Sequence, residues 1–543
     1  MARPPVKASL GLGISTGLIV SLILLPLIAV AVFGARALVQ TDTLVVLAES
    51  VLLEYVLNTL LLSAIAGAVA LGFGLPGAWF VTAYRFVGHK VLRWSLVLPM
   101  AMPAYVLAYA YTDALDPSGW LYVEIAQVAA ALGFTLPRID IRSVWGAGIL
   151  LGVALSPYVA LLAKNAFEER QGAAFDAARA LGLKPYEIFF RLALPLARPA
   201  WIAGLALVVM ECFADYGTVA FFSVPTLSTG LFKAWFSYGD RYSAALLALF
   251  MMITISCLLW VEHRARGRAQ WANSRIGTKA QPITVRGPRG LAMAACCATP
   301  GLLGFVIPIA LLLHAAYTAE ASPRWSLLIT QMINTIALGL IAVLVIIPAA
   351  WLGAYAIRQT GHWLARVVRL AAAGYAMPGL VVAVGLLAWS GLLTELADRL
   401  LDWRVSLVTS GALVVGAYLT RFFAVGLSAV ESGMARITQN IDWSASSLGL
   451  SKREIFSRIH FPLMRGATGV AALLVFVDVV KELPATLVLR PFNVETLAVS
   501  AHHLAADELL SQAAWPAIMI GLVGLLPLLV QAIAPEKPGV SRP

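Results

Sequence analysis

Charged residues are scarce in this sequence. Of its 543 residues, 12% are Asp, Glu, Lys or Arg, whereas 60% are hydrophobic. Soluble globular proteins are charged at about a quarter of their positions, so this composition excludes an ordinary soluble protein and indicates an integral membrane protein. Cysteine is also rare. Because the four cysteines lie within apolar stretches, no disulfide framework is expected.

The sequence also lacks a phosphate-binding loop of the form Gly-x-x-x-x-Gly-Lys-Ser/Thr, and the nearest approach, Gly277-Thr278-Lys279, has no preceding glycine. The segments expected in water hold no Ser/His/Asp or Cys/His arrangement that would support catalysis. We therefore expect a chain that is not an enzyme and binds no cofactor itself. His460 and the pair His502-His503 have no neighbouring third ligand, which favours surface positions over a metal site.

Long apolar stretches are what the sequence has instead. A helix needs about 20 apolar residues to cross a bilayer core. The first stretch, from Leu10 to Phe33, is too long for the apolar part of a signal peptide, so we interpret it as a retained helix. Twelve stretches are long enough to cross, near residues 10–33, 56–83, 92–112, 145–165, 198–222, 242–262, 292–316, 332–356, 367–393, 406–430, 467–489 and 512–533. They predict an all-α integral membrane fold of about twelve transmembrane helices.

The basic residues predict the orientation of these spans. The net charge is +11, which in a soluble protein would suggest a nucleic-acid partner. With twelve spans and a cytoplasmic N-terminus, 29 of the 39 Lys and Arg residues fall in cytoplasmic segments. Cytoplasmic loops of membrane proteins carry this excess, so we expect both termini in the cytoplasm and no nucleic-acid partner. The segment 263–290 has seven basic residues and no acidic one. It is either a contact for anionic membrane lipid or a solvated linker.

The chain contains an internal duplication. A spacing of 267 residues aligns Gly182 with Gly449 and, beyond them, Glu187 with Glu454, Arg191 with Arg458 and Pro195 with Pro462. Similar spacings align Asn58-Thr59 with Asn334-Thr335, Trp79 with Trp351, and Ala101-Met102-Pro103 with Ala376-Met377-Pro378. All repeats run in the same direction, which predicts two parallel six-span halves, 1–262 and 291–543, joined by the linker 263–290. The duplicated polar loops lie at about 166–197 and 431–465.

These two loops resemble the cytoplasmic coupling loop of binding-protein-dependent ABC importer permeases. The family motif reads Glu-Ala-Ala, three residues, Gly, nine residues, Ile, one residue, Leu-Pro. The first loop has Asp176-Ala177-Ala178, Gly182 and Leu194-Pro195; the second departs at Trp443-Ser444-Ala445 and keeps Gly449, Ile459 and Pro462. The resemblance implies a type I importer permease fold in a bacterial inner membrane. It also implies two copies of a separate ATPase, which binds ATP and Mg, and a periplasmic substrate-binding protein. The residues implied to contact the ATPase are Asp176, Ala177, Ala178, Gly182, Pro195, Ser444, Ala445, Gly449, Ile459 and Pro462.

Within this superfamily the chain is most similar to the fused two-half permeases of ferric iron importers. That similarity rests on Asp215-Tyr216-Gly217-Thr218-Val219, Phe232-Lys233-Ala234-Trp235-Phe236, Lys481-Glu482-Leu483-Pro484-Ala485-Thr486 and Leu489-Arg490-Pro491-Phe492-Asn493. Fused permeases for thiamine and aminophosphonate look similar, so these and other small solutes remain alternatives to ferric iron. The binding protein is expected to contact segments 113–142, 223–241 and 489–509. A secondary transporter that works without an ATPase is a rival of another class, but it would not need the repeated loop.

Four acidic residues lie inside predicted spans at matching positions. Glu211 and Asp215 are four residues apart, and the spacing of 267 maps them onto Asp478 and Glu482. Four residues apart on a helix means one face, and charges within spans usually face a bundle interior or a water-filled cavity. Two readings stay open. The four carboxylates line a path for a hard cation, or they are structural and neutralised by Lys481 or an Arg.

Overall fold

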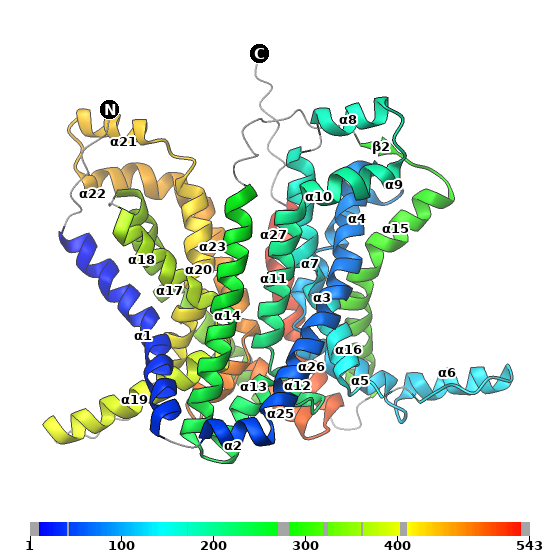
Figure 1. The fold of residues 1–543 in the computed structure, drawn as a ribbon, viewed down its shortest axis with the longest axis horizontal. Helices are drawn as coiled ribbons and strands as arrows, with labels where there is room; N and C mark the ends of the chain where they lie inside the picture. The colour runs from blue at the N-terminus through cyan, green and yellow to red at the C-terminus, as the bar shows by residue number, and fades with distance from the viewer. Residues whose placement is uncertain are drawn as a thin grey trace. The chain divides into compact units, whose positions relative to one another are not determined.

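The computed structural model describes residues 10–40, 43–138, 140–170, 172–269, 282–318, 324–359, 362–401 and 410–533. These residues are almost entirely helical, which confirms the all-α prediction (Figure 1). The exception is a short parallel pair of strands, β1 (Tyr84–Arg85) and β2 (Ile283–Thr284). The strand β2 lies in the predicted linker 263–290, of which residues 270–281 lie outside the described ranges.

Among the described residues, ten helices are long and apolar enough to cross a membrane. There are eleven if the segments Pro185–Leu196 and Arg198–Ala214, bent by 72°, form one span. The predicted span near 92–112 is not one helix. It is divided among α4 (His89–Ser95), the 3-10 turn η1 (Leu98–Ala101) and α5 (Ala104–Leu115). Pro99 and Pro103 account for the break, because proline lacks an N–H and disfavours helix at the residue before it.

The chain divides into two compact units. Unit 1 comprises Met1–Thr41, Trp325–Val499 and Leu529–Pro543, and its helices α17, α20 and α23 pack together, with α1 packed on α17, α18, α19 and α20. Its elements are α1 (Leu10–Gln40), α17 (Trp325–Gln359), α18 (His362–Ala372), η6 (Ala373–Ala376), α19 (Gly379–Leu401), α20 (Ala412–Met434), α21 (Gln439–Ser447), α22 (Lys452–Ile455), the π-helical turn η8 (Phe456–His460), α23 (Phe461–Lys481) and α24 (Pro484–Leu489). Two helices, α25 (Leu497–Ala506) and α27 (Leu526–Ile533), contain residues of both units.

Unit 2 comprises Asp42–Arg324 and Ser500–Leu528. Its helices α3, α7 and α11 pack together, α15 packs on α3 and α4, and α16 packs on α5 and α26. Besides the elements already bounded, unit 2 contains α2 (Thr43–Ser50), α3 (Leu52–Ala83), α6 (Trp120–Ala131), α7 (Val144–Arg170), α8 (Gly172–Ala180), α9 (Pro185–Ile188), the π-helical turn η2 (Phe189–Ala193), α10 (Leu194–Leu196), α11 (Arg198–Ala214), α12 (Gly217–Phe221), α13 (Leu227–Phe232), η3 (Lys233–Ser237), α14 (Arg241–Ala269), α15 (Pro288–Gly301), η5 (Leu302–Val306), α16 (Ile307–Thr318) and α26 (Leu510–Gly524).

Small residues set the distance between α3 and α7. A Cβ atom at Gly74 would lie 2.8 Å from the Cβ of Val159, and one at Gly152 would lie 2.8 Å from the main-chain oxygen of Ala66. Membrane helices gain little from burying apolar surface that lipid covers equally well, so their association depends on close packing of this kind. The α3–α7 contact is one side of the scaffold that carries the first polar loop.

The packing units differ from the halves drawn from the repeat. The helix α1 precedes every residue of unit 2 but packs in unit 1, and α15 and α16, which begin at the end of the predicted linker and beyond it, pack in unit 2. The repeat records how the sequence was duplicated, whereas packing follows the complementarity of helix faces. The predicted halves 1–262 and 291–543 therefore do not coincide with the packing units: α1 belongs to unit 1, whereas α15, α16 and Ser500–Leu528 belong to unit 2.

Candidate functional site

The first polar loop is a helix, a tight turn and a bent helix. The turn after α8 passes through Gly182, whose φ of +80° suits glycine because it has no Cβ. The N–H of Gly182 donates to the oxygen of Arg179 at 2.9 Å, and the N–H of Leu183 donates to the oxygen of Ala178 at 3.1 Å. This pair of bonds is a Schellman motif, which satisfies the last carbonyls of the helix. The next helix, α9, is capped by Glu187, which accepts from the N–H of Lys184 at 2.9 Å.

The second polar loop repeats this construction. Gly449 has a φ of +86° and donates to the oxygen of Ser446 at 3.1 Å. Glu454 caps α22 by accepting from the N–H of Ser451 at 2.9 Å. Each capping glutamate also lies near an arginine one turn later, 3.6 Å for Glu187–Arg191 and 3.5 Å for Glu454–Arg458. The duplicated Gly, Glu and Arg positions are therefore those that shape the turn.

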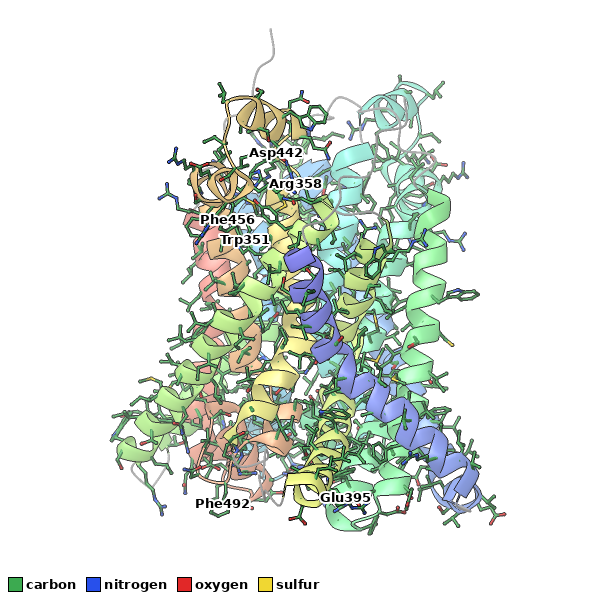
Figure 2. All side chains as sticks on the ribbon, turned by 90° about the vertical axis from the view of Figure 1, so that its left-hand side faces the viewer. Trp351, Arg358, Glu395, Asp442, Phe456 and Phe492 are labelled. Carbon is green, nitrogen blue, oxygen red and sulfur yellow. The ribbon has the colours of Figure 1, made fainter. Side chains whose placement is uncertain are left out.

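A tryptophan holds each loop against its unit. In unit 2, the rings of Trp79 and Phe189 lie 5.5 Å apart. In unit 1, the rings of Trp351 and Phe456, at the matching positions, lie 5.4 Å apart. Figure 2 shows Trp351 and Phe456 at one end of unit 1 and Phe492 at the opposite end. The repeated tryptophans are thus packed inside the units and join α3 or α17 to the bend that follows the turn.

Some of the residues predicted to contact the ATPase are exposed on these loops, and others are buried. Ala177 and its counterpart Ser444 are exposed, as are the two turn glycines and Pro195. Ile459 and Pro462 are half-buried, and Ala178 and Ala445 are buried against their units. The side chain of Asp176 lies outside the described residues, although its backbone belongs to α8.

One pair of exposed residues was not among those predicted to contact the ATPase. Leu181 and Leu448 are each 82% exposed at the tip of their loops. An apolar side chain so far out of the fold is available for contact with another protein. The signal was present in the sequence, because both residues directly precede the duplicated glycine and are 267 positions apart.

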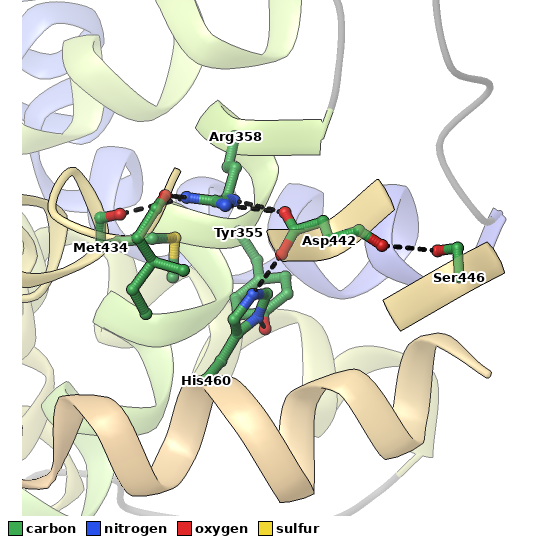
Figure 3. Close-up of polar contacts among 7 residues, drawn as sticks. Tyr355, Arg358, Met434, Asp442, Ser446 and His460 are labelled. Atoms are coloured by element: carbon green, nitrogen blue, oxygen red, sulfur yellow. Dashed lines mark hydrogen bonds and ion pairs between the residues drawn. The ribbon is translucent and has the colours of Figure 1, made fainter. Parts of the chain in front are cut away.

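The second loop carries a polar network around Asp442 (Figure 3). Its Oδ2 accepts from the Arg358 guanidinium at 2.7 and 3.1 Å, and its Oδ1 lies 2.7 Å from Nε2 of His460. The other ring nitrogen of His460 bonds the hydroxyl of Tyr355. Arg358 also donates to the main-chain oxygens of Met434 and Ile437. The network fastens α21, the first helix of the second polar loop, to the ends of α17, α20 and η8.

The first loop has apolar residues where this network sits. The spacing of 267 maps Asp442 onto Phe175 and His460 onto Ala193, and both belong to the buried cluster around Trp79. The rings of Trp79 and Phe175 lie 5.6 Å apart. Helix α8 of the first loop is therefore held by apolar packing, whereas α21 of the second loop is held by an ion pair and a histidine. The prediction that these histidines lie at the surface was wrong for His460 and His502, which are both buried. A ring nitrogen of His502 lies 2.9 Å from the hydroxyl of Tyr109.

Asp215 and Glu482 cap short helices that follow breaks in their spans. Asp215 accepts from the N–H groups of Thr218 and Val219, both at 3.1 Å, and so caps α12. Glu482 accepts from the N–H groups of Ala485 and Thr486, both at 2.9 Å, and caps α24. A carboxylate at this position satisfies orphan N–H groups and complements the helix dipole. Glu482 additionally pairs with Arg421 at 3.0 Å.

The other two predicted acids lie one turn earlier. Asp478 pairs with Lys481 at 3.6 Å, and its side chain remains 31% exposed. Glu211 is half-buried in α11. Among the described residues, no group of three or more His, Cys, Asp or Glu side chains is arranged to hold a metal ion. The acids of each unit can offer charge along its helices but form no closed ligand set there.

The repeated Asn-Thr pairs tie down the segments beyond these caps. In unit 2, Asn58 donates to the oxygen of Pro225 at 3.0 Å, and the hydroxyl of Thr59 accepts from the N–H of Leu227 at 3.1 Å. In unit 1, Asn334 donates to the oxygen of Glu495 at 3.0 Å, and Thr335 accepts from the N–H of Leu497 at 2.9 Å. Leu227 and Leu497 begin helices, so the threonines fill positions that lack an intrahelical partner. In each unit, therefore, a carboxylate caps the short helix after the break, and an Asn-Thr pair binds the main chain of the segment that follows.

Comparison with known proteins finds similarity to a transport family over part of the chain. Residues 70–264 match the family described as binding-protein-dependent transport system inner membrane component. The chain is 21% identical over 488 residues to the Fe(3+)-transport system permease protein FbpB 2 of Haemophilus influenzae, covering 88% of each protein. It is 28% identical over 217 residues to the sulfate transport system permease protein CysT of Escherichia coli, covering 39% of this chain and 74% of that one. For the molybdenum transport system permease protein ModB of Escherichia coli, the identity is 25% over 227 residues, covering 40% and 96%.

Proposed function

We propose that this chain is a fused inner membrane permease of a binding-protein-dependent ABC importer and that it conducts ferric iron across the inner membrane. The observation that carries this proposal is the length of one match. The similarity to the iron permease extends over 88% of both chains, whereas the sulfate and molybdenum permeases named above match 39% and 40% of this chain. A shared two-half architecture over the whole chain favours a shared cargo.

We further propose the partners and the orientation. Both termini and both polar loops face the cytoplasm, where one copy of a separate ATPase docks on each loop and carries the ATP and Mg. Leu181 and Leu448 extend the predicted contact set, because they present the exposed apolar side chains at the two tips. Closure of the ATPases would push on α8 and α21, and the bent helices behind Gly182 and Gly449 would carry the motion to α11 and α23.

The four intramembrane acids have two roles in this proposal. Asp215 and Glu482 shape the iron path, because they hold α12 and α24 where the spans break. Glu211 and Asp478 offer negative charge along it, one turn closer to the loops. Hard cations prefer oxygen ligands. Weak, open carboxylate contacts suit transport better than a closed site, because the cargo must leave again.

Oxyanion import is a second candidate, favoured by the partial matches to sulfate and molybdenum permeases. Uptake of radiolabelled ferric iron by cells that lack this chain separates the candidates. Complementation with the wild-type chain should restore iron uptake. Excess sulfate, molybdate, thiamine or aminophosphonate should not reduce it. The chain with Gly182→Pro and Gly449→Pro, checked for normal membrane levels, should not restore it. Restored sulfate or molybdate uptake without iron uptake would refute the iron proposal and leave the importer assignment standing.

A further inference from the structure

Unit 2 contains a pocket at the end of its helices remote from the polar loop. The pocket has a volume of about 470 Å³ and lies between the end of α5, the start of α6, the end of α16 and the loop before α26. Figure 1 shows α5 and α6 at one end of unit 2 and α8 at the other. Ligand pockets typically measure about 300–1,000 Å³, so the volume is sufficient for a side chain of a partner protein.

The charge of the pocket is negative. Asp113, Asp116 and Glu508 line it together with one cation, Arg142. Arg142 is committed to Glu508, to which it donates at 2.7 and 3.0 Å, and its Nε lies 3.9 Å from Asp116. His314 lies beside the pocket, close enough to Asp113 to interact with its charge. Among the described residues that line the pocket, three acidic side chains therefore face one basic side chain, and that one is bonded to Glu508.

The pocket also contains hydrogen-bond donors without an acceptor. The Thr112 side chain is fully buried, and its hydroxyl has no hydrogen-bond partner among the described residues. The indole N–H of Trp120 is likewise buried and unpartnered there, while its ring lies 4.0 Å from that of His314. Leaving such groups unpaired costs about 1–3 kcal/mol each. A native fold tolerates that cost where a ligand supplies the missing partners.

The fold itself does not require these polar residues. The repeat aligns Ala101-Met102-Pro103 with Ala376-Met377-Pro378, so α5 and α19 start at matching positions. The same spacing of 275 residues aligns Thr112, Asp113 and Asp116 with Leu387, Ala388 and Gly391 of α19 in the sequence. The second copy of the helix therefore forms with none of these groups. We therefore assign the two acids and the buried hydroxyl to a role that only the first copy of the helix has.

We propose that this pocket receives a Lys or Arg side chain of the substrate-binding protein when that protein docks. The proposal rests on the proposed function, which turns this end of unit 2 toward the periplasm. The ammonium or guanidinium group would be held by Asp113 and Asp116, and the donors of Thr112 and Trp120 would meet carbonyl oxygens of the same segment. A bare metal ion fits less well, since no three ligating side chains converge among the described residues.

The test uses the complete importer in proteoliposomes with the binding protein that stimulates it. The readout is the concentration of binding protein that gives half-maximal stimulation of ATP hydrolysis. The variant with Asp113→Asn and Asp116→Asn should raise this concentration on the order of tenfold without changing hydrolysis in the absence of binding protein. Glu124→Gln, at an exposed acid of α6 outside the pocket, is the matched control and should behave as wild type.

Chemical modification of the binding protein identifies the occupant. Acetylating its lysines, or blocking its arginines with phenylglyoxal, should weaken stimulation of the wild-type importer. One of the two treatments should have no further effect on the double variant. The proposal would be overturned if both treatments weakened stimulation equally in the wild-type importer and in the double variant. It would also be overturned if the double variant needed no more untreated binding protein than wild type for half-maximal stimulation. A third contrary outcome concerns lipid. If omitting phosphatidylethanolamine from the proteoliposomes weakened stimulation of the wild-type importer as much as the double substitution does, the pocket would be assigned to a lipid amine. Because the readout is ATP hydrolysis, an error in the identity of the cargo leaves this test readable.

Discussion

At the scale of single residues, Asp442 is the centre of the polar network in the second polar loop. Asp442→Asn keeps the shape of the side chain but removes the charge opposite Arg358, whose side chain is 12% exposed. Breaking a partly buried pair leaves a poorly compensated cation, so we expect a loss of roughly 1–3 kcal/mol in stability. We also expect more ATP hydrolysed per ion transported, because α21 is less firmly attached to α17.

A spin label at Leu448 measures that attachment directly. Asp442→Asn should make a label at Leu448 more mobile and leave a label at its counterpart Leu181 unchanged. Equal changes at both labels would mean general loosening of the protein, and no change at Leu448 would remove Asp442 as a positioning residue.

The two helix-capping acids differ in how much they support. Asn is as good a helix cap as Asp, so Asp215→Asn should cost less than about 1 kcal/mol. Glu482→Gln should cost roughly 3 kcal/mol or more, because it leaves Arg421 opposite a neutral group in a site where the Glu482 side chain is 1% exposed. Unfolding in a detergent titration measures both. A reversed order of stability would show that the caps do not dominate at these positions.

Glu508 gives the outer pocket a dependence on pH. Hydrogen bonds from Arg142 hold the pKa of Glu508 below its ordinary value. A carboxyl whose pKa is lower in the folded state stabilises the fold above its unfolded pKa of about 4.3. It loses that contribution as the pH falls through the folded value. Wild type should therefore exceed Glu508→Gln in thermal stability between about pH 5 and 8, by no more than about 1 kcal/mol because the pair is exposed. A difference that persists at lower pH, in paired melting curves, would contradict this assignment.

At the scale of elements, the turn glycines are the most sharply constrained positions. Gly182→Ala and Gly449→Ala place a Cβ in open space but in a left-handed conformation, which costs roughly 1–2 kcal/mol per residue. Each should lower iron uptake at equal membrane levels, and Asn, which tolerates this conformation, should recover part of it. Gly13→Ala and Gly17→Ala in α1, where space is also open, are the matched controls and should retain uptake. Equal loss in controls and turn variants would exclude the turn as the cause.

The elements also separate what sequence can predict from what it cannot. Span length and the duplicated turns were predictable, because apolar length and repeated Gly, Glu and Arg positions are local signals. The stretch 198–222 was predicted as one span, but α11 ends at Ala214 and α12 follows. Hydropathy cannot detect this break, since the residues on both sides are apolar. The network around Asp442 was also unpredictable, because Arg358 lies 84 residues from it in the chain.

At the scale of the whole molecule, the first span of each half packs in the unit built mostly from the other half. Expressed alone, residues 1–275 leave α1 without α17 and α19, and residues 276–543 leave α15 and α16 without α3 and α5. We expect each fragment to be degraded quickly by itself and stabilised by the other, with uptake partly restored when both are made. Pulse-chase labelling measures the lifetimes. A long-lived single fragment would show that its exchanged helix is dispensable for stability.

The early position of α1 in the chain also sets an order of events during biosynthesis. The ribosome completes α1 at Gln40 but begins its partner α17 only at Trp325. At about 5–20 residues per second, that interval lasts roughly 15–60 s. During that time α1 resides in lipid without its final neighbours. Its sequence must therefore be apolar enough to remain inserted alone. Its 31 residues contain no charged side chain before Arg36, which meets that requirement.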